Sequence, residues 1–168
     1  MRWFLWLGLS SCFLMNAAWG QIFYVGVSDT RKPISTGEMT RPFTLGGLFP
    51  LDDGTFWGLD IASEGIRLES TYGRTNVPSP AVSGNLLLGT TLSEDEDTRI
   101  LGGILLGARG ISASCPASNL GYQCYADREP DISYGFNYGA LIMLDFGGFS
   151  LGFRSTNVSQ QAVLGLQF

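Results

Sequence analysis

The chain has 168 residues, including 23 glycines, and its formal net charge at neutral pH is −5. An acidic chain of this kind is poorly suited to bind nucleic acid or anionic lipid head groups through charge. Because the sequence contains no histidine, it lacks the base on which serine–histidine and histidine–aspartate mechanisms depend. We therefore expect no enzyme activity and no cofactor.

Residues 1–20 have the pattern of a cleaved signal peptide. A short basic start precedes an apolar run over residues 3–15, and Ala-Trp-Gly at 18–20 supplies small residues at the cleavage positions. The run of about thirteen residues is too short to span a membrane as a helix. We expect cleavage before Gln21, which leaves a single domain of residues 21–168. In the alternative, Leu-Ser-Ser-Cys ending at Cys12 resembles a lipobox, and Cys12 would be acylated.

Apolar residues recur in steps of two along the middle of the chain, and this period predicts β-strands. The turn signals between them are Asp52-Asp53-Gly54 and Glu64-Gly65, and the latter is typical of a two-residue hairpin with positive φ. Polar or proline-containing loops are expected at 29–42 and 75–83. The predicted strands cover residues 22–28, 43–51, 55–63, 66–74, 85–92 and 99–109.

The run from Ser93 to Asp97 is strongly acidic and follows one of these strands. A cation site is conceivable there. However, carboxylates in a calcium loop alternate with glycine and spacer residues at set positions, and this run does not. A solvated turn between two strands is the better interpretation, and we expect no metal site.

Residues 133–168 carry the clearest pattern of the chain. One row is apolar from Tyr134 to Phe146, while most residues between its members are small or polar. The pattern restarts after Gly147-Gly148 and again after residues 155–157. Since the polar row is rich in glycine and charge while the apolar row is capped by aromatics, the pattern is that of a meander with its apolar face turned outward to lipid.

The number of strands depends on the first segment. Counting back from the C-terminus gives eight strands beginning near Phe43, and residues 22–28 would make a ninth. Single-chain bacterial barrels have even strand numbers, so either the first strand does not span or two segments merge. With eight strands from Phe43, the turns at 64–65, 94–97 and 146–148 fall in the periplasm, and the long connection 110–132 lies outside.

The inward row contains charged residues of both signs. A barrel of eight strands is just wide enough for side chains to fill it, and a buried charge must be paired. We therefore expect a plug of ion pairs rather than an open channel, with Asn85 and Asn137 beside it. The predicted charge network comprises Asp60, Arg67, Glu69, Arg99, Arg109, Asp145 and Arg154.

Two cysteines follow the proposed cleavage site. Cys115 and Cys124 lie in a segment rich in glycine, serine, proline and asparagine. In an exported protein the usual outcome is a disulfide that closes a loop. A metal site would need further ligands, and histidine is absent.

The last residues resemble a known class of proteins. Ala162, Leu164, Leu166 and the terminal Phe168 alternate like the C-terminal assembly signal of Gram-negative outer-membrane proteins. With the signal peptide and the meander, the chain resembles the small eight-stranded barrels of the outer-membrane protein A and outer-membrane protein X type. The resemblance implies an all-β, antiparallel up-and-down transmembrane barrel in the outer membrane. It also implies contact with lipid and lipopolysaccharide, and insertion through periplasmic chaperones and the barrel assembly machinery.

Three functions are compatible with these patterns. The favoured one is a structural or surface-interaction barrel whose extracellular loops make its contacts, since loops on a rigid scaffold often carry function. A soluble lipocalin-like barrel that binds a small apolar ligand is the alternative, supported by apolar residues on the inward row: Leu87, Leu101, Leu105, Leu141 and Met143. The third is a narrow diffusion channel. Each inward assignment depends on register, because a slip of one residue exchanges the two faces of a strand.

Overall fold

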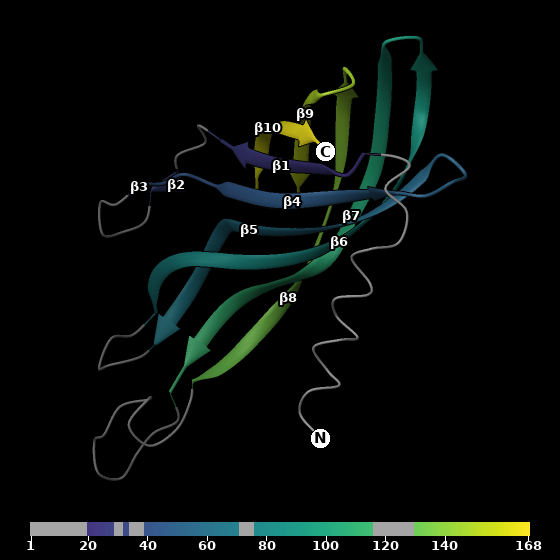
Figure 1. The fold of residues 1–168 in the computed structure, drawn as a ribbon. Helices are drawn as coiled ribbons and strands as arrows, with labels where there is room; N and C mark the ends of the chain where they lie inside the picture. Colours follow the sequence, from purple (N-terminus) through teal and green to yellow (C-terminus); the bar gives the residue numbers. More distant parts are fainter. Residues whose placement is uncertain (1–19, 29–31, 34–38, 71–75, 116–129) are drawn as a thin grey trace, which may run out of the picture.

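The computed structural model describes residues 20–28, 32–33, 39–70, 76–115 and 130–168. Eight of its strands form a closed barrel in the order β1-β10-β9-β8-β7-β6-β5-β4, while β2 and β3 form a separate two-stranded sheet (Figure 1). The predicted class, an all-β antiparallel barrel, is confirmed. The strands are β1 (Ile22–Val27), β2 (Lys32–Pro33), β3 (Met39–Thr40), β4 (Phe43–Pro50), β5 (Thr55–Ser70), β6 (Val77–Asp95), β7 (Thr98–Ser114), β8 (Asp131–Asp145), β9 (Phe149–Thr156) and β10 (Gln160–Gln167).

The barrel closes through its first strand. β1 pairs with β10 on one side, where Phe23 faces Leu166, and with β4 on the other, where Val25 faces Leu45. The count of eight that starts near Phe43 is therefore wrong. The other possibility, that two predicted segments merge, is correct, because residues 55–63 and 66–70 belong to one strand, β5.

The predicted hairpin at Glu64-Gly65 is a bulge inside β5. Gly65 has the expected positive φ of 73°, but the pairing with β6 continues past it, from Ser63↔Val82 to Ile66↔Pro80. One extra residue on β5 is thus accommodated without reversing the chain. Glycine at positive φ serves both a two-residue turn and a bulge, so the local sequence does not distinguish them.

The predicted loop at 75–83 is wrong over most of its length, because residues 77–83 belong to β6 in spite of their two prolines. β6 begins at Val77 and includes Pro78 and Pro80, which face Leu68 and Ile66 of β5. Its pairing with β7 begins only at Ser83. Proline lacks an N–H and is tolerated where a strand has a partner on one side alone, which is the situation of this part of β6. The predicted loops at 29–42 and 110–132 are likewise shortened by β2, β3 and the extensions of β7 and β8.

Burial alternates along the strands with the apolar row outside. On β8, Phe136, Tyr138 and Ile142 are exposed, whereas Asn137 and Asp145 are buried. The same holds on β10, where Leu164 and Leu166 are exposed. Among the described residues, no helix is long and apolar enough to cross a membrane.

The two ends of the barrel differ. At the terminal end, where β1 starts and β10 stops, the β4–β5, β6–β7 and β8–β9 connections are tight turns. At the opposite loop end, the β5–β6 and β7–β8 hairpins extend together beyond the shorter strands (Figure 1, lower left). There β5 adds a short parallel pairing to β7, with Leu68 opposite Ser112, and Ser70 O accepts a hydrogen bond from Cys115 N at 3.2 Å.

Candidate functional site: the packed lumen

The centre of the lumen is organised around Arg154 on β9, whose side chain is fully buried. Its Nε and Nη2 donate to the two carboxylate oxygens of Asp60, each at 2.8 Å. Its Nη1 and Nη2 donate to the two oxygens of Glu64, at 2.8 and 3.0 Å. Both acids come from β5, so one guanidinium fork joins β5 to β9 across the inside of the barrel. Bidentate pairs of this type are the strongest of the charge-assisted hydrogen bonds.

Neutral donors complete the shell of Asp60. The Tyr24 hydroxyl donates to its Oδ2 at 2.8 Å, and Asn85 Nδ2 donates to its Oδ1 at 2.6 Å. Tyr24 comes from β1 and Asn85 from β6. Asp60 therefore holds the first strand of the barrel to the middle ones as well as binding Arg154.

Glu64 collects a second set of donors. Ser83 Oγ lies 2.6 Å and Asn137 Nδ2 2.9 Å from its Oε1. Thr156 Oγ1 donates to its Oε2 at 2.9 Å, and the Ser159 hydroxyl also donates to this oxygen. With Arg154, Glu64 thus contacts side chains from β6, β8, β9 and the β9–β10 connection. Two buried acids around one buried arginine are tolerable only because polar groups surround both carboxylates. We call Arg154, Asp60, Glu64 and their donors the central cluster.

An apolar layer separates the central cluster from the terminal end. The apolar residues that support the lipocalin-like alternative in the sequence lie in this layer. Leu87, Leu105, Leu141 and Met143 are at most 1% exposed, and Leu101 is 7% exposed. They pack with Ile22, Leu48, Phe56 and Val163 in one cluster. The lumen is thus filled by polar side chains at its centre and by apolar side chains below it.

The remaining predicted charges occupy the two ends of the lumen. Near the terminal end, Arg99 Nε donates to Asp145 Oδ2 at 3.1 Å, and Ser150 Oγ donates to Asp145 Oδ1 at 3.0 Å. At the loop end, Arg67 Nη2 lies 3.6 Å from Glu69 Oε2, and both side chains are more than a quarter exposed. Arg109 pairs with no acid among the described residues, and its Nη1 donates to Ile66 O at 3.0 Å.

No family model matches the chain, and no curated protein matches it in sequence. Among solved structures, the outer membrane protein Ail of Yersinia pestis in a phospholipid bilayer nanodisc is 17% identical. That match covers 89% of this chain and 99% of that one, with a TM-score of 0.46. A crystal structure of Ail, the attachment invasion locus protein of Y. pestis, in complex with the heparin analogue sucrose octasulfate is 13% identical. It covers 89% and 94% of the two chains, with a TM-score of 0.37.

The sequence missed several members of the central cluster. The predicted turn at 64–65 contains Glu64, although Glu64 continues the inward row of Asp60 and Ala62 in steps of two. That periodicity could have placed it inside. Tyr24, which donates to Asp60, lies in the predicted strand 22–28, but its local sequence does not indicate this partner. Ser83 lies in the predicted loop 75–83 and Ser159 follows the break in the pattern at residues 155–157, and nothing in their local sequence indicates a buried partner.

Cys115 is disulfide-bonded. Cys124 lies outside the described residues, so the Cys115–Cys124 pairing stays a prediction. The signal peptide and the lipobox cysteine, Cys12, lie outside the described residues too. The predicted assembly signal is the outer face of β10, where Leu164, Leu166 and Phe168 are exposed, and the ring of Phe168 lies edge-on to Phe23 at 6.2 Å.

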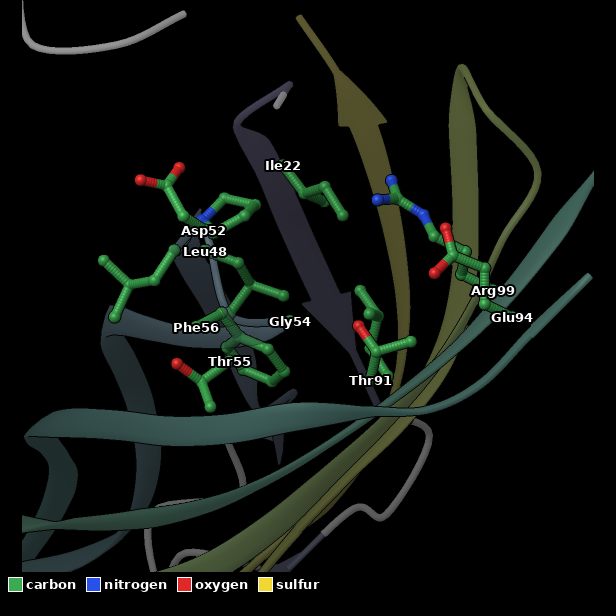
Figure 2. Close-up of a pocket in the computed structure, with 12 residues that line it drawn as sticks. Ile22, Leu48, Asp52, Gly54, Thr55, Phe56, Thr91, Glu94 and Arg99 are labelled. Atoms are coloured by element: carbon green, nitrogen blue, oxygen red, sulfur yellow. The ribbon is translucent and has the colours of Figure 1, made fainter. Parts of the chain in front are cut away.

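A pocket of about 230 Å³ opens at the terminal end, beneath the apolar layer (Figure 2). The β4–β5 turn forms one wall of it. The Thr55 hydroxyl and then the Thr55 backbone N–H donate to Asp53 in this turn, and these bonds hold the pKa of the Asp53 carboxyl below its usual value. Thr91 N also donates to Gly54 O at 2.9 Å, which ties the turn to β6.

Within the described residues, no group of three or more histidine, cysteine, aspartate or glutamate side chains could hold a metal.

Proposed function

We propose that this chain is an integral outer-membrane barrel with a closed lumen, which uses its extracellular loops as a contact surface. The observation that carries the proposal is the distribution of polarity between the two faces of the wall. The centre of the lumen holds buried charges, while the outside is apolar on every barrel strand. Apolar surface of this extent is unfavourable in water, at roughly 25 cal/mol per Å², and favourable in lipid.

Two groups of aromatic side chains on the outer face support a membrane position. At the terminal end, Phe49 stacks on Trp57 at 4.6 Å and Phe146 stacks on Phe149 at 5.0 Å. Toward the loop end, Phe136 stacks on Tyr138 at 5.8 Å. Aromatic girdles at both interfaces of an apolar band are typical of barrels that span the outer membrane.

The asymmetry of the connections supports one orientation in the membrane. Outer-membrane barrels have short turns on the periplasmic side and longer loops outside. The terminal end carries the short turns and would face the periplasm, whereas the loop end, with Cys115, would face the cell exterior. The connection that follows Cys115 is the longest and is our candidate for the contact surface.

The structure of the lumen argues against both alternatives. A lipocalin-like carrier needs an apolar interior with room for its ligand, but here the centre is occupied by Arg154 with Asp60 and Glu64. A diffusion channel needs a continuous polar path. The apolar layer around Leu105 and Met143, both fully buried, blocks such a path below the central cluster.

The partners follow from this assignment. We propose contact with outer-membrane lipid and lipopolysaccharide, transport by periplasmic chaperones, and insertion by the barrel assembly machinery through the outer row of β10 that ends at Phe168. We propose neither a catalytic activity nor a cofactor, because the chain lacks histidine.

Cell fractionation combined with gel mobility tests the proposal. A closed barrel keeps its hydrogen-bonded wall in cold detergent and unfolds on boiling, so the band of outer-membrane material should shift between the two treatments. Recovery in the soluble periplasmic fraction, with one band under both conditions, would contradict the membrane assignment.

The contact role of the loop needs a separate measurement. Replacing residues 116–123 by a glycine–serine linker of equal length should leave the mobility shift intact while reducing adherence of expressing cells to a surface or to other cells. Unchanged adherence in a correctly inserted variant would contradict this role.

A further inference from the structure

The pocket at the terminal end has an apolar floor and an acidic rim. Its floor is formed by lumen residues that are at most 7% exposed: Ile22, Leu48, Phe56 and Leu101. Its rim carries Asp52 from the β4–β5 turn and Glu94 near the end of β6. Figure 2 shows these two acids on opposite sides of the pocket, with Ile22 between them and Arg99 beside Glu94.

The size of the pocket limits what it can hold. About 230 Å³ is more than ten times the roughly 10–15 Å³ that one water molecule requires. It is below the roughly 300–1,000 Å³ of pockets that enclose a drug-sized molecule. The space therefore suits a single large apolar side chain rather than a whole small-molecule ligand.

The charges around the pocket select a cation. The positive charge of Arg99 at the rim is compensated by the buried carboxylate of Asp145, which does not line the pocket. Asp52 and Glu94 have no ion-pair partner among the described residues. Four more acids stand on the same two connections: Asp53, Asp95, Glu96 and Asp97. An anionic group would be repelled here, whereas basic groups beside the pocket would be attracted.

Backbone hydrogen bonds hold the wall that the β4–β5 turn gives to the pocket. Leu51 N donates to Thr55 O at 2.8 Å and Gly54 N donates to Leu51 O at 3.3 Å, while Thr91 N bonds to Gly54 O. The wall is therefore fixed before any ligand arrives, which lowers the entropic cost of binding. Since the barrel is closed, its strands offer no free edge along the wall for strand addition, and a ligand must bind through its side chains.

From this geometry we infer that the terminal-end pocket binds a basic peptide segment of a partner protein. One apolar side chain enters the pocket, and flanking lysine or arginine side chains contact Asp52 and Glu94. In the orientation proposed above, the partner is periplasmic; the binding itself does not depend on that orientation.

Short peptides provide the test. The folded barrel, residues 21–168 in nanodiscs of zwitterionic lipid, is titrated with the blocked tripeptide Lys-Phe-Lys, with Lys-Gly-Lys and with Glu-Phe-Glu. Amide chemical shifts of Thr55, Thr91 and Leu101 follow the titration. We expect saturable shifts with Lys-Phe-Lys, affinity at least about fivefold weaker with Lys-Gly-Lys, since the apolar contact is lost, and no saturation with Glu-Phe-Glu.

Matched variants separate the pocket from the general acidity of this end. Asp52→Asn with Glu94→Gln should weaken Lys-Phe-Lys binding about tenfold, because two charge contacts of the exposed kind are lost. Glu96→Gln with Asp97→Asn removes the same charge outside the pocket lining and should change affinity less than about twofold. The mobility shift on boiling verifies that each variant is a folded barrel, so a failure to form the barrel is distinguished from a failure to bind. Equal losses in the two double variants, equal binding of Lys-Phe-Lys and Lys-Gly-Lys, or no binding of Lys-Phe-Lys would overturn the inference.

Discussion

The ion pairs at the centre and at the loop end of the lumen use the same residue types in different surroundings. Arg154 is fully buried, and its two acids accept hydrogen bonds from six neutral donors, which leave little of either carboxylate free. Arg67 and Glu69 are partly exposed, and their charged atoms are 3.6 Å apart. Burial makes the first group expensive to disrupt, because a charge left alone there has no water to solvate it. If the contact between Arg67 and Glu69 is lost, water can solvate both charges.

The largest effect is expected at Arg154. Arg154→Met leaves Asp60 and Glu64 buried without a cation, and we expect a loss of about 3–5 kcal/mol in the free energy of unfolding. Urea titration of the barrel in lipid vesicles measures it. Adding Asp60→Asn and Glu64→Gln to the same variant removes the uncompensated charges and should restore a large part of the loss. A triple variant no more stable than Arg154→Met would contradict the electrostatic explanation.

Disruption of the Arg99–Asp145 pair should have a smaller effect. Asp145→Asn keeps the size of the side chain but removes the charge that Arg99 and Ser150 contact, and Arg99 can turn partly to solvent. We expect a loss of about 1.5–3 kcal/mol, the range for hydrogen bonds to a charged group. Asp97→Asn, in the exposed β6–β7 turn, is the control and should lie within about 0.5 kcal/mol of the parent. The same urea titration compares them, and equal midpoints would contradict the prediction.

Gly46 tests the packing around Tyr24 rather than charge. A Cβ at Gly46 would lie 2.1 Å from Cζ of the Tyr24 ring, so Gly46→Ala must displace the ring and its hydrogen bond to Asp60. We expect a loss of about 1–3 kcal/mol, as for overpacking elsewhere. At Gly84 a Cβ would meet no atom within 4 Å, and Gly84→Ala should have little effect on the thermal midpoint of barrel unfolding. If both variants melt alike, the close approach is not important for stability.

The smallest effect is expected at the loop end. Arg67→Met removes the partly exposed pair with Glu69 and should cost at most about 1 kcal/mol. Because salt screens exposed pairs, the difference from the parent should shrink further when the urea titration is repeated at 0.5 M sodium chloride. A loss as large as that of Arg154→Met would show that exposure does not distinguish the two groups.

The sequence predicted most of the wall of the barrel and less of its interior. The period of two in β8 and β10 was strong enough to assign the outer face, because a row of seven apolar side chains, from Tyr134 to Phe146, has one plausible orientation. The same rule placed Asp60, Asp145 and Arg154 on the inward row. It could not specify partners, since which strands meet across the lumen depends on closure by β1 and on the strand register.

The errors arose where one residue type serves two structures. Gly65 has positive φ in a bulge as it would in a turn, and this ambiguity removed Glu64 from the predicted network. Pro78 and Pro80 indicated a loop, although a strand with a partner on one side alone accommodates them. Ser83 and Ser159 became important through contacts to Glu64 from distant parts of the chain, and local sequence carries no record of such contacts.

Trp57 gives the most direct test of the central claim that the outer face of the barrel is in lipid. After cleavage at the predicted site it is the only tryptophan, because the other three of the four lie within residues 1–20. It is 38% exposed on the outer face of β5. Residues 21–168 are folded into vesicles whose phospholipids carry bromine near the head of the acyl chain, and Trp57 fluorescence is recorded. The proposed barrel predicts strong quenching by the brominated lipid and weak quenching by aqueous iodide. Quenching by iodide alone would contradict it.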